Sequence, residues 1–350
     1  MNLTVNINET LTSNYPIVDV RSPFEYNQGH IPNAVNIPLF SDEERTEIGI
    51  VYKKKSEKAA IDLGLKIVNP KLNDFILKAR QIAPELKVVV HCWRGGMRSN
   101  SFAKLLSDNG FAEVKVITGG YRSYRKYIRE FLGKPFRLNV LGGYTGSGKT
   151  MILKELEKIG QQVIDLEDLA NHKGSAFGGI NQAPQPTNEH FENLLYYKLS
   201  KLDLSKDVWL EDESRNIGKV VIPDVFFEQM QKAGLYFIDI PKEERAKFLV
   251  VDYKSCDRNL LKQSVLKISK RLGGQNVIKA LKLIDENKLY EAALITLHYY
   301  DKAYLNMMQT RVQNNIIKLD LPTVDKHKNA ELIFAQHCNL SNSRFSASQG

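Results

Sequence analysis

Residues 136–150 read Phe136-Arg-Leu-Asn-Val-Leu-Gly-Gly-Tyr-Thr-Gly-Ser-Gly-Lys-Thr150, and their pattern is the strongest indication of the fold of the second half of the chain. An apolar run over 136–141 leads into a glycine loop of the form G-x-x-x-x-G-K-T, and residues 151–159 are composed like a helix. A strand, a glycine loop and a helix in this order are the context of a phosphate-binding P-loop. The stretch therefore predicts an α/β domain with a phosphate site.

The loop contains a suitable group for each part of a bound phosphate. Backbone N–H groups and the positive end of the following helix bind phosphate oxygens, Lys149 neutralises them, and Thr150 can hold Mg²⁺. The motif identifies a diphosphate or triphosphate site, but it leaves open what is attached to the phosphates. The predicted phosphate-binding residues are Gly143, Gly146, Ser147, Gly148, Lys149 and Thr150.

Three carboxylates stand at the end of one strand of the same predicted P-loop domain, which spans 134–240. Glu211, Asp212 and Glu213 occupy the place where a carboxylate positions water or meets Mg²⁺ through water beside a P-loop. The alternative is an acidic turn exposed to solvent. The strands that would complete a small parallel sheet are Gln162–Leu166, Val208–Leu210 and Leu235–Ile240.

A glycine-rich loop begins at Asp165, at the end of another predicted strand, and reaches Pro186. Such a loop can close over a ligand, and His172, Lys173 and Ser175 are its candidates for contacting a diphosphate or an RNA phosphate. A mobile polar surface loop explains these three residues nearly as well.

The chain turns helical and basic over 241–338, which we interpret as a helical region attached to the P-loop domain. The serine-rich residues at the end of the chain predict a disordered tail over 339–350. The expected helices are Lys242–Tyr253, Leu260–Leu272, Asn276–Asn287 and Leu289–Met308.

The first 133 residues alternate short β-branched runs with helical stretches, which predicts βα units on a parallel sheet. Lys71–Ala83 carries apolar residues at helical spacing between two of these runs. The expected strands include Pro16–Val20, Lys87–His91 and Val114–Ile117.

His91-Cys-Trp-Arg-Gly-Gly-Met-Arg-Ser99 follows one of these strands and precedes a predicted helix at 100–109. Backbone N–H groups of such a loop, together with the helix start, form a positive concavity that stabilises a thiolate. Arg94 and Arg98 add positive charge, so Cys92, Arg94 and Arg98 are the candidate catalytic residues. The alternative is a buried structural cysteine, and the two arginines and two glycines argue against burial.

Composition limits the number of domains and the class of partner that the chain can have. The 350 residues are 43% apolar, which suffices for two or three domains, and the net charge of +9 favours an anionic partner such as nucleic acid, a nucleotide or a diphosphate. Neither a membrane span nor a secretory signal is predicted, so we expect a cytoplasmic protein. Cys92, Cys256 and Cys338 form no C-x-x-C pair, and we interpret the last two as incidental.

Residues 17–26 and 29–38, followed by Ile117-Thr-Gly-Gly-Tyr121, resemble the rhodanese family over about 5–130. The resemblance implies a rhodanese-like parallel-sheet domain over 1–133, with Cys92 as the sulfur-carrying nucleophile. We interpret Asp19 and Arg21 as an ion pair without a chemical role. A Cys-x-x-x-x-x-Arg loop also occurs in cysteine phosphatases, but the opening signature makes that use less favoured.

The pairing of this domain with a P-loop NTPase-like domain resembles the tRNA 2-selenouridine synthase family over nearly the whole chain. Asp212-Glu-Ser-Arg215, Arg271-Leu-Gly-Gly274 and Tyr299-Tyr-Asp301 add to the likeness, whereas Lys173 stands where arginine is expected. The resemblance implies conversion of wobble 2-thiouridine in tRNA to 2-selenouridine with selenophosphate. It also implies S-geranylation of that base from geranyl diphosphate.

Under this hypothesis the P-loop holds geranyl diphosphate, and Mg²⁺ bound at Thr150 assists. Cys92 either carries selenium or helps to capture selenophosphate. No tightly bound cofactor and no membrane partner are expected, and the oligomeric state is not predicted. The candidate residues for gripping the tRNA backbone, which have a solvated helix face as their alternative reading, are Lys262, Lys267, Lys270, Arg271, Lys279 and Lys282.

Two rival functions remain at this point. One is a thiosulfate-type sulfurtransferase fused to an ATP-dependent small-molecule kinase, which would act without RNA. The other is a regulatory protein in which the rhodanese-like domain is inert and the P-loop acts as a nucleotide switch. An intact anion loop around Cys92 speaks against inertness.

Overall fold

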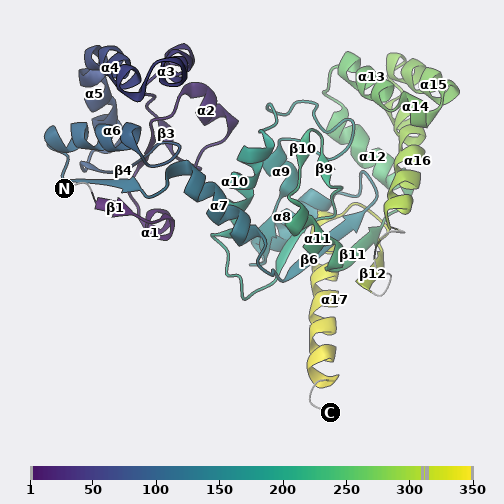
Figure 1. The fold of residues 1–350 in the computed structure, drawn as a ribbon. Coiled ribbons are helices and arrows are strands. Elements are labelled where there is room, and N and C mark those ends of the chain that lie inside the picture. The colour runs from purple at the N-terminus through teal and green to yellow at the C-terminus, as the bar shows by residue number, and fades with distance from the viewer. Residues whose placement is uncertain (1–2, 309–310, 312–314, 348–350) are drawn as a thin grey trace. The chain divides into compact units, whose positions relative to one another are not determined.

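A computed structural model describes residues 3–308, 311 and 315–347 of the chain (Figure 1). It divides into two compact units, 1–132 with 192–197 and 133–191 with 198–350. The main division therefore falls one residue before the predicted boundary. The predicted boundaries placed the short segment 192–197 in the P-loop domain, whereas in the structure it belongs to the first unit. No helix among the described residues is both long and apolar enough to cross a membrane.

The first unit is built on a five-stranded sheet whose neighbouring strands are all parallel. Helices cover both faces of such a sheet, which is why Val88, Val89 and Val90 in its central strand are all buried. The strand order is β1 (Leu3–Val5), β5 (Glu113–Ile117), β4 (Lys87–His91), β2 (Ile17–Asp19) and β3 (Val35–Asn36).

Seven α-helices accompany this sheet in the described part of the first unit. Phe75 and Ala79 on α5, and Phe102, Ala103 and Leu106 on α6, pack into the same core as the central strands. The helices are α1 (Ile7–Thr12), α2 (Pro23–Gln28), α3 (Asp42–Lys54), α4 (Glu57–Val68), α5 (Leu72–Ile82), α6 (Met97–Asp108) and α7 (Gly120–Leu132).

The segment 192–197 of α10 (Asn188–Leu199) completes the first unit. The buried Arg125 on α7 donates a hydrogen bond of 2.6 Å to the side-chain oxygen of Asn193 and forms an ion pair with Glu192. Tyr196 packs edge-on against Tyr124 and Phe131. A distant part of the chain therefore supplies both charge and aromatic packing to α7.

The second unit contains another five-stranded, fully parallel sheet, with the strand that leads into the P-loop at its centre. A short antiparallel pair, β9 (Asn216–Ile217) and β10 (Val220–Val221), lies apart from it. The strand order is β12 (Ile316–Asp320), β11 (Gly234–Asp239), β6 (Leu138–Gly143), β8 (Val208–Glu211) and β7 (Gln162–Ile164). The helices of this α/β part are α8 (Lys149–Lys158), α9 (Leu166–Ala170), α11 (Asp224–Lys232) and α17 (Lys326–Ala347).

The C-terminal part of the chain differs from the predicted helical region at 241–338. Strand β12 pairs with β11, and α17 packs on the same core as Trp209 through Ala330 and Ile333. Residues from 316 onward thus belong to the α/β core. The helix α17 also runs to Ala347, across most of the predicted disordered tail. Its buried anchor residues precede the polar end, so the composition of that end concealed the helix.

The helical region itself spans 242–308 and has its own small core, formed by Leu261, Val265, Ala280, Ile284 and Ala292 with their neighbours. The predicted helix at 260–272 is two helices, because the chain leaves helical geometry at Ile268. The helices are α12 (Lys242–Tyr253), α13 (Arg258–Lys267), α14 (Ser269–Leu272), α15 (Gly274–Asp285) and α16 (Leu289–Met308).

Replacing Ile333 by alanine tests whether α17 is part of the P-loop core. Ile333 is fully buried, so Ile333→Ala should lower the free energy of unfolding of the second unit by about 2–5 kcal/mol. The neighbouring Leu332 is 42% exposed, and Leu332→Ala should cost about 0.5 kcal/mol or less. Urea unfolding in a Trp93→Phe background, with Trp209 as the remaining tryptophan, measures both. Equal small effects would contradict the packing described for α17.

Candidate functional site: a cysteine loop and a P-loop

The cysteine loop lies between β4 and α6, at the end of the first sheet where the strand gives way to a helix. The start of α7 closes it, because the N–H groups of Tyr121 and Arg122 donate to the carbonyls of Cys92 and Trp93, both at 2.9 Å. Gly120 has a φ of 59°, and a Cβ there would sit 2.4 Å from the carbonyl oxygen of Cys92. The glycine pair at 119–120 thus permits the close approach that shapes the loop.

Cys92 is 3% exposed, so the expectation that this loop keeps it unburied is wrong. Burial alone would raise the pKa of the thiol, yet hydrogen bonds and charge outweigh it and the pKa is lowered. The Ser99 hydroxyl lies 3.2 Å from Sγ, the Arg98 charge acts on it, and the N–H groups of Ser99 and Arg94 point to it. The thiolate is therefore favoured in a buried position.

The two predicted arginines differ in their surroundings. Arg98 donates from Nη1 to Oε2 of Glu25 at 2.9 Å, and Glu25 in turn belongs to the capping box of α2 with Ser22. Arg94 is exposed beside the loop. Ser99 was not among the predicted site residues. Its position directly after Arg98, in the first turn of the helix that follows the loop, is the sequence feature that could have identified it.

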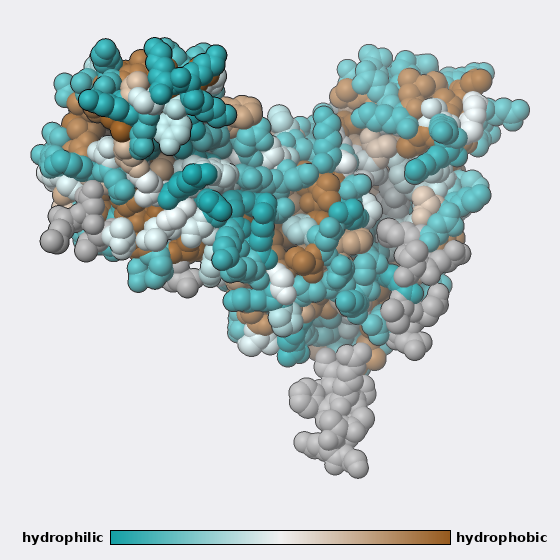
Figure 2. Space-filling view, in the orientation of Figure 1, coloured by the Kyte–Doolittle hydropathy of each residue, from teal (hydrophilic) through white to brown (hydrophobic). Residues whose placement is uncertain are grey.

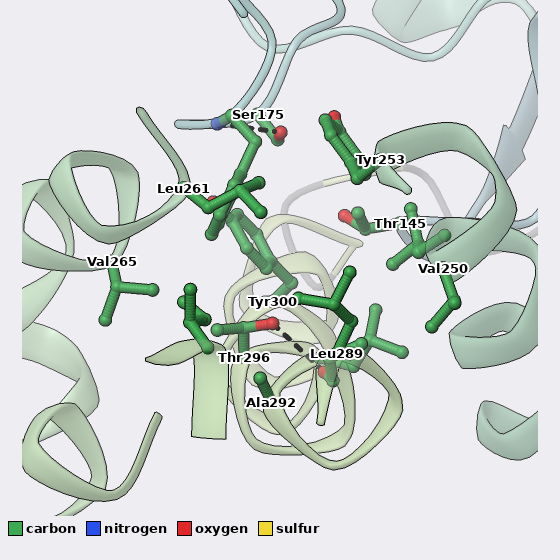
Figure 3. A pocket seen from close by; sticks show the side chains of 15 residues that line it. Thr145, Ser175, Val250, Tyr253, Leu261, Val265, Leu289, Ala292, Thr296 and Tyr300 are labelled. Atoms are coloured by element: carbon green, nitrogen blue, oxygen red, sulfur yellow. Dashed lines mark hydrogen bonds between the residues drawn. The ribbon is translucent and has the colours of Figure 1, made fainter. Parts of the chain in front are cut away.

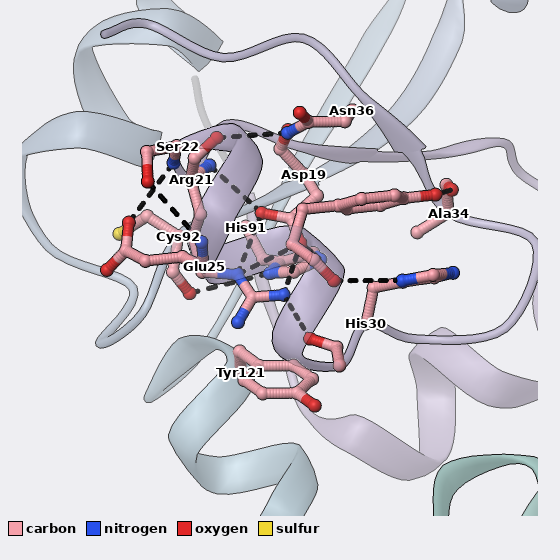
Figure 4. A network of polar contacts seen from close by, with 12 residues as sticks. Asp19, Arg21, Ser22, Glu25, His30, Ala34, Asn36, His91, Cys92 and Tyr121 are labelled. Atoms are coloured by element: carbon pink, nitrogen blue, oxygen red, sulfur yellow. Dashed lines mark hydrogen bonds and ion pairs between the residues drawn. The ribbon is translucent and has the colours of Figure 1, made fainter. Parts of the chain in front are cut away.

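The buried pair of Asp19 and Arg21 supports the loop from behind, and the predicted ion pair is confirmed at 2.6 Å (Figure 4). Arg21 also donates to the carbonyl of Gly29 at 2.7 Å, and its guanidinium lies 3.8 Å from the ring centre of Tyr121. His91, next to Cys92, is fully buried, and burial lowers its pKa. This network ties the end of β2 to the start of α7.

The P-loop is held in shape by its own side chains. Lys149 Nζ donates to the carbonyl of Gly143 at 3.1 Å, and the Ser147 hydroxyl donates to the carbonyl of Tyr144 at 2.7 Å. Gly148 immediately precedes α8, so the loop's backbone leads into the helix N-terminus as predicted. The Thr150 hydroxyl donates to Oε2 of Glu167 at 3.0 Å.

The three carboxylates at the end of β8 are buried, which excludes the exposed acidic turn. Each has a different set of partners. Glu211 accepts from the N–H of Leu166 at 3.1 Å. Asp212 is bound by Arg311 and by the Tyr304 hydroxyl, and is therefore occupied within the protein. Glu213 lies near Lys149 of the P-loop and interacts with it electrostatically.

Glu213 and Glu167 interact electrostatically with each other and with Lys149, and the pKa of both carboxyl groups is raised. Burial, followed by the neighbouring Glu167 charge, raises the pKa of Glu213 to about 8. Burial also raises the pKa of Glu167, although Lys149 and Thr150 act against this. Thr150 Oγ1 and these two carboxyl groups are oxygen ligands of the kind that Mg²⁺ prefers. Glu167 was missed because it follows a different strand, β7.

The glycine-rich loop folds over these carboxyls. A Cβ on Gly174 would lie 2.8 Å from Oε2 of Glu213 and 3.0 Å from Oε1 of Glu167, so only glycine allows this approach. Of the three predicted contact residues, Lys173 forms an ion pair with Asp252 at 2.9 Å. Burial lowers the pKa of His172, and the charge of Lys267 lowers it further.

An apolar pocket opens beside the P-loop (Figure 3). Its empty space is about 600 Å³ when the part open to solvent is counted. Thr145 of the P-loop and Ser175 of the glycine-rich loop are its polar members, and Tyr253 and Tyr300 add aromatic rings. The other lining residues, from α12, α13, α15 and α16 and the glycine-rich loop, are Phe177, Leu249, Val250, Leu261, Val265, Ile284, Leu289, Ala292, Ala293, Thr296 and Leu297.

Helix α16 is fastened to the P-loop at two points. The Tyr304 hydroxyl accepts from the N–H of Gly143 at 3.2 Å and donates to Asp212 at 2.6 Å. Asp301 pairs at 2.8 Å with the buried Arg245, which donates to the carbonyl of Thr145 at 3.1 Å. None of these contacts was predicted, because they join segments far apart in sequence.

The six predicted tRNA contacts lie on α13, α14 and α15. Lys262 pairs with Asp285 at 2.8 Å, and Arg271 donates to the Tyr299 hydroxyl at 3.4 Å. The exposed lysines among them are Lys267, Lys270, Lys279 and Lys282. Figure 2 shows hydrophobic residues between the hydrophilic ones in this region, where Leu260, Leu266 and Ile278 are exposed. Their role in RNA binding stays a prediction.

The raised pKa of Glu213 predicts a pH dependence of stability. Folded Glu213 keeps its proton up to about pH 8, whereas a glutamate in the unfolded chain releases it near 4.5. The folded state therefore binds more protons between these values, and the free energy of unfolding falls as pH rises through this window. Glu213→Gln should make this fall shallower when unfolding is measured from pH 5 to 8 without divalent cations.

The exposed Glu157 on α8 provides the matched control, because Glu157→Gln changes the charge of the same unit without touching the cluster. This control should follow the wild-type pH profile. A Glu213→Gln profile parallel to the wild type would contradict the proton assignment.

Comparisons with known proteins agree with both halves of the structure. Residues 136–332 match the family described as tRNA 2-selenouridine synthase AAA domain, and residues 6–127 match the rhodanese-like domain. The rhodanese-like domain and the P-loop α/β domain predicted from the sequence are thereby confirmed.

The similar proteins include three named tRNA 2-selenouridine synthase that together illustrate the extent of the likeness. The protein of Sulfurovum sp. (strain NBC37-1) is 35% identical over 83% of this chain and 88% of its own length. That of Nitrosomonas europaea is 33% identical over 87% and 91%, and that of Shewanella frigidimarina is 32% identical over 91% and 96%. The likeness thus spans both units and most of each relative, and this chain belongs to the tRNA 2-selenouridine synthase family.

Proposed function

We propose that this chain replaces the sulfur of wobble 2-thiouridine in tRNA by selenium, in two steps that use its two anion sites. Family membership supports the overall reaction. The observation that supports the division into steps is the apolar pocket beside the P-loop, which adjoins it at Thr145. A phosphate loop next to a hydrocarbon-lined space suits a ligand with a diphosphate head and an apolar tail.

In the first step the P-loop unit binds geranyl diphosphate. The thiocarbonyl sulfur of the base forms a bond to C1 of the geranyl group, the C1–O bond breaks, pyrophosphate leaves and the N3 proton is released. Lys149 and the loop N–H groups stabilise the negative charge that develops on the leaving pyrophosphate. Mg²⁺ held by Thr150 with Glu167 or Glu213 would add positive charge at the same oxygens.

In the second step selenium replaces the alkylated sulfur. The selenium of selenophosphate bonds to C2 and the C2–S bond breaks, so that geranylthiol leaves with a proton; this is easier than loss of sulfide because the alkyl group has removed the negative charge. Water then attacks phosphorus, the P–Se bond breaks, phosphate leaves, and the base keeps a C2=Se group with a proton on N3. We assign Cys92 and its loop to the capture of selenophosphate. Capture needs no change of oxidation state, whereas a perselenide on Cys92 formed from selenophosphate would need an oxidant.

The pocket also bears on the rival kinase function. A nucleotide presents ribose hydroxyls and a polar base, and the lining described above is dominated by apolar side chains. Burying such polar groups without partners costs free energy. This argument favours a prenyl diphosphate over ATP as the ligand that extends from the P-loop into the pocket.

Two substitutions should separate the two steps. Cys92→Ala should abolish formation of 2-selenouridine and leave S-geranylation of thiolated tRNA largely intact, as measured by mass spectrometry of tRNA nucleosides. The control is Cys338→Ala on α17, which should leave both activities unchanged. Loss of both activities in Cys92→Ala would overturn the assignment of the steps to two units.

Lys149→Ala should weaken geranyl diphosphate binding by about 10- to 100-fold, since a charge-assisted hydrogen bond contributes about 1.5–3 kcal/mol. Titration calorimetry with geranyl diphosphate and, separately, ATP measures this effect. Lys154→Ala, an exposed change on the same helix, is the control. Unchanged affinity in Lys149→Ala, or tighter binding of ATP than of geranyl diphosphate by the wild type, would overturn the ligand assignment.

The basic helices should give tRNA binding a strong dependence on salt. Replacing Lys267, Lys270 and Lys279 together by alanine should reduce the slope of log K against log salt by about 1 for each tRNA phosphate that the variant no longer neutralises. Filter binding at several salt concentrations measures the slope. A control with the acid-paired lysines Lys104, Lys126 and Lys158 replaced should keep the wild-type slope. Equal slopes in both triple variants would refute the tRNA role.

A further inference from the structure

One face of α16 runs without interruption from the apolar pocket to the P-loop. Residues spaced three or four apart lie on the same side of a helix, and Ala292, Thr296 and Tyr300 all line the pocket. The next residue in this series, Tyr304, binds the N–H of Gly143 in the P-loop. Position along α16 is therefore a measure of distance from the phosphate site.

The rise of an α-helix converts this position into length. Thr296 lies eight residues before Tyr304, which corresponds to about 12 Å of helix, and Ala292 lies twelve residues before it, or about 18 Å. Thr296 thus stands midway along the wall, and Ala292 stands farther from the phosphates. Val265, fully buried, and Ile284, 3% exposed, line the pocket from α13 and α15.

Beyond Tyr300, the side chains on this wall are small. Ala292 and Ala293 offer only a methyl group, and the Thr296 hydroxyl donates to the carbonyl of Ala293 at 3.0 Å, within the helix. The Thr296 hydroxyl therefore needs no polar partner from a ligand in the pocket. Figure 3 shows Thr296 and Ala292 in the same pocket as Thr145 and Ser175, which mark its phosphate side.

We propose that Thr296 and Ala292 determine how long a hydrocarbon chain this enzyme accepts, with α16 as the measuring wall. This inference rests on the proposed use of the P-loop for a prenyl diphosphate. A bulky side chain at position 296 excludes the second isoprene unit, because it fills the pocket nearer to the P-loop than position 292 does. The same side chain at position 292 leaves two units room and excludes a third.

The test compares dimethylallyl, geranyl and farnesyl diphosphate as donors to thiolated tRNA, by kcat/KM. Thr296→Phe should lower the ratio of geranyl to dimethylallyl transfer about tenfold or more, the discrimination that a hydrophobic pocket gives for chain size. Ala292→Phe should lower the ratio of farnesyl to geranyl transfer more than the ratio of geranyl to dimethylallyl transfer. Unchanged ratios in both variants, or the reverse order of effects, would overturn the proposal.

Three controls keep the result interpretable. Thr296→Val removes only the internally bonded hydroxyl and should keep the wild-type ratios. Leu305→Phe adds the same ring at an exposed position of α16 and should also keep them. Inorganic pyrophosphate should bind all variants with the wild-type Kd, because the P-loop is untouched. A variant that loses this binding is replaced by Thr296→Leu or Ala292→Leu.

A wild type that transfers none of the three donors would refute the proposed function itself, whereas transfer with unchanged ratios refutes only the role of α16.

Discussion

Both candidate anion sites depend on the same constraint: the chain must pass from the end of a parallel strand into a helix within a few residues. At the end of β4 and again at the end of β6, a glycine-containing turn directs backbone N–H groups to one point in front of a helix start. The first turn surrounds the Cys92 thiol, and the second leads to Lys149 and Thr150 at the start of α8.

The charges around these turns are balanced in different ways. In the first unit, Arg98 has a carboxylate partner in Glu25 and still favours the Cys92 thiolate. In the second unit, burial and neighbouring carboxylate charge raise the pKa of Glu213 and Glu167. The first loop thus favours an anion at Cys92, whereas the carboxyl groups of the second favour their neutral form.

The sequence predicted those features that short contiguous segments determine. The P-loop, the cysteine loop and helix α12 were found where the structure has them, because each depends on local spacing or on a motif. Strand β12 was missed because it is a half-buried edge strand without an apolar run. Glu167, Tyr304 and Arg311 were missed for a different reason. Their partners lie on other strands and helices, and no periodicity in one segment reports such contacts.

The return of the chain to the first unit at 192–197 has a consequence for how this protein can be divided. A fragment ending at Leu132 would contain every strand of the first sheet, the cysteine loop and α7, yet Arg125 would lose Asn193 and Glu192, and Tyr124 would lose Tyr196. These losses remove a charge-assisted hydrogen bond, an ion pair and an edge-on aromatic contact from α7. Because the start of α7 closes the cysteine loop, a fragment ending at Leu132 is expected to hold that loop less firmly than the whole chain does.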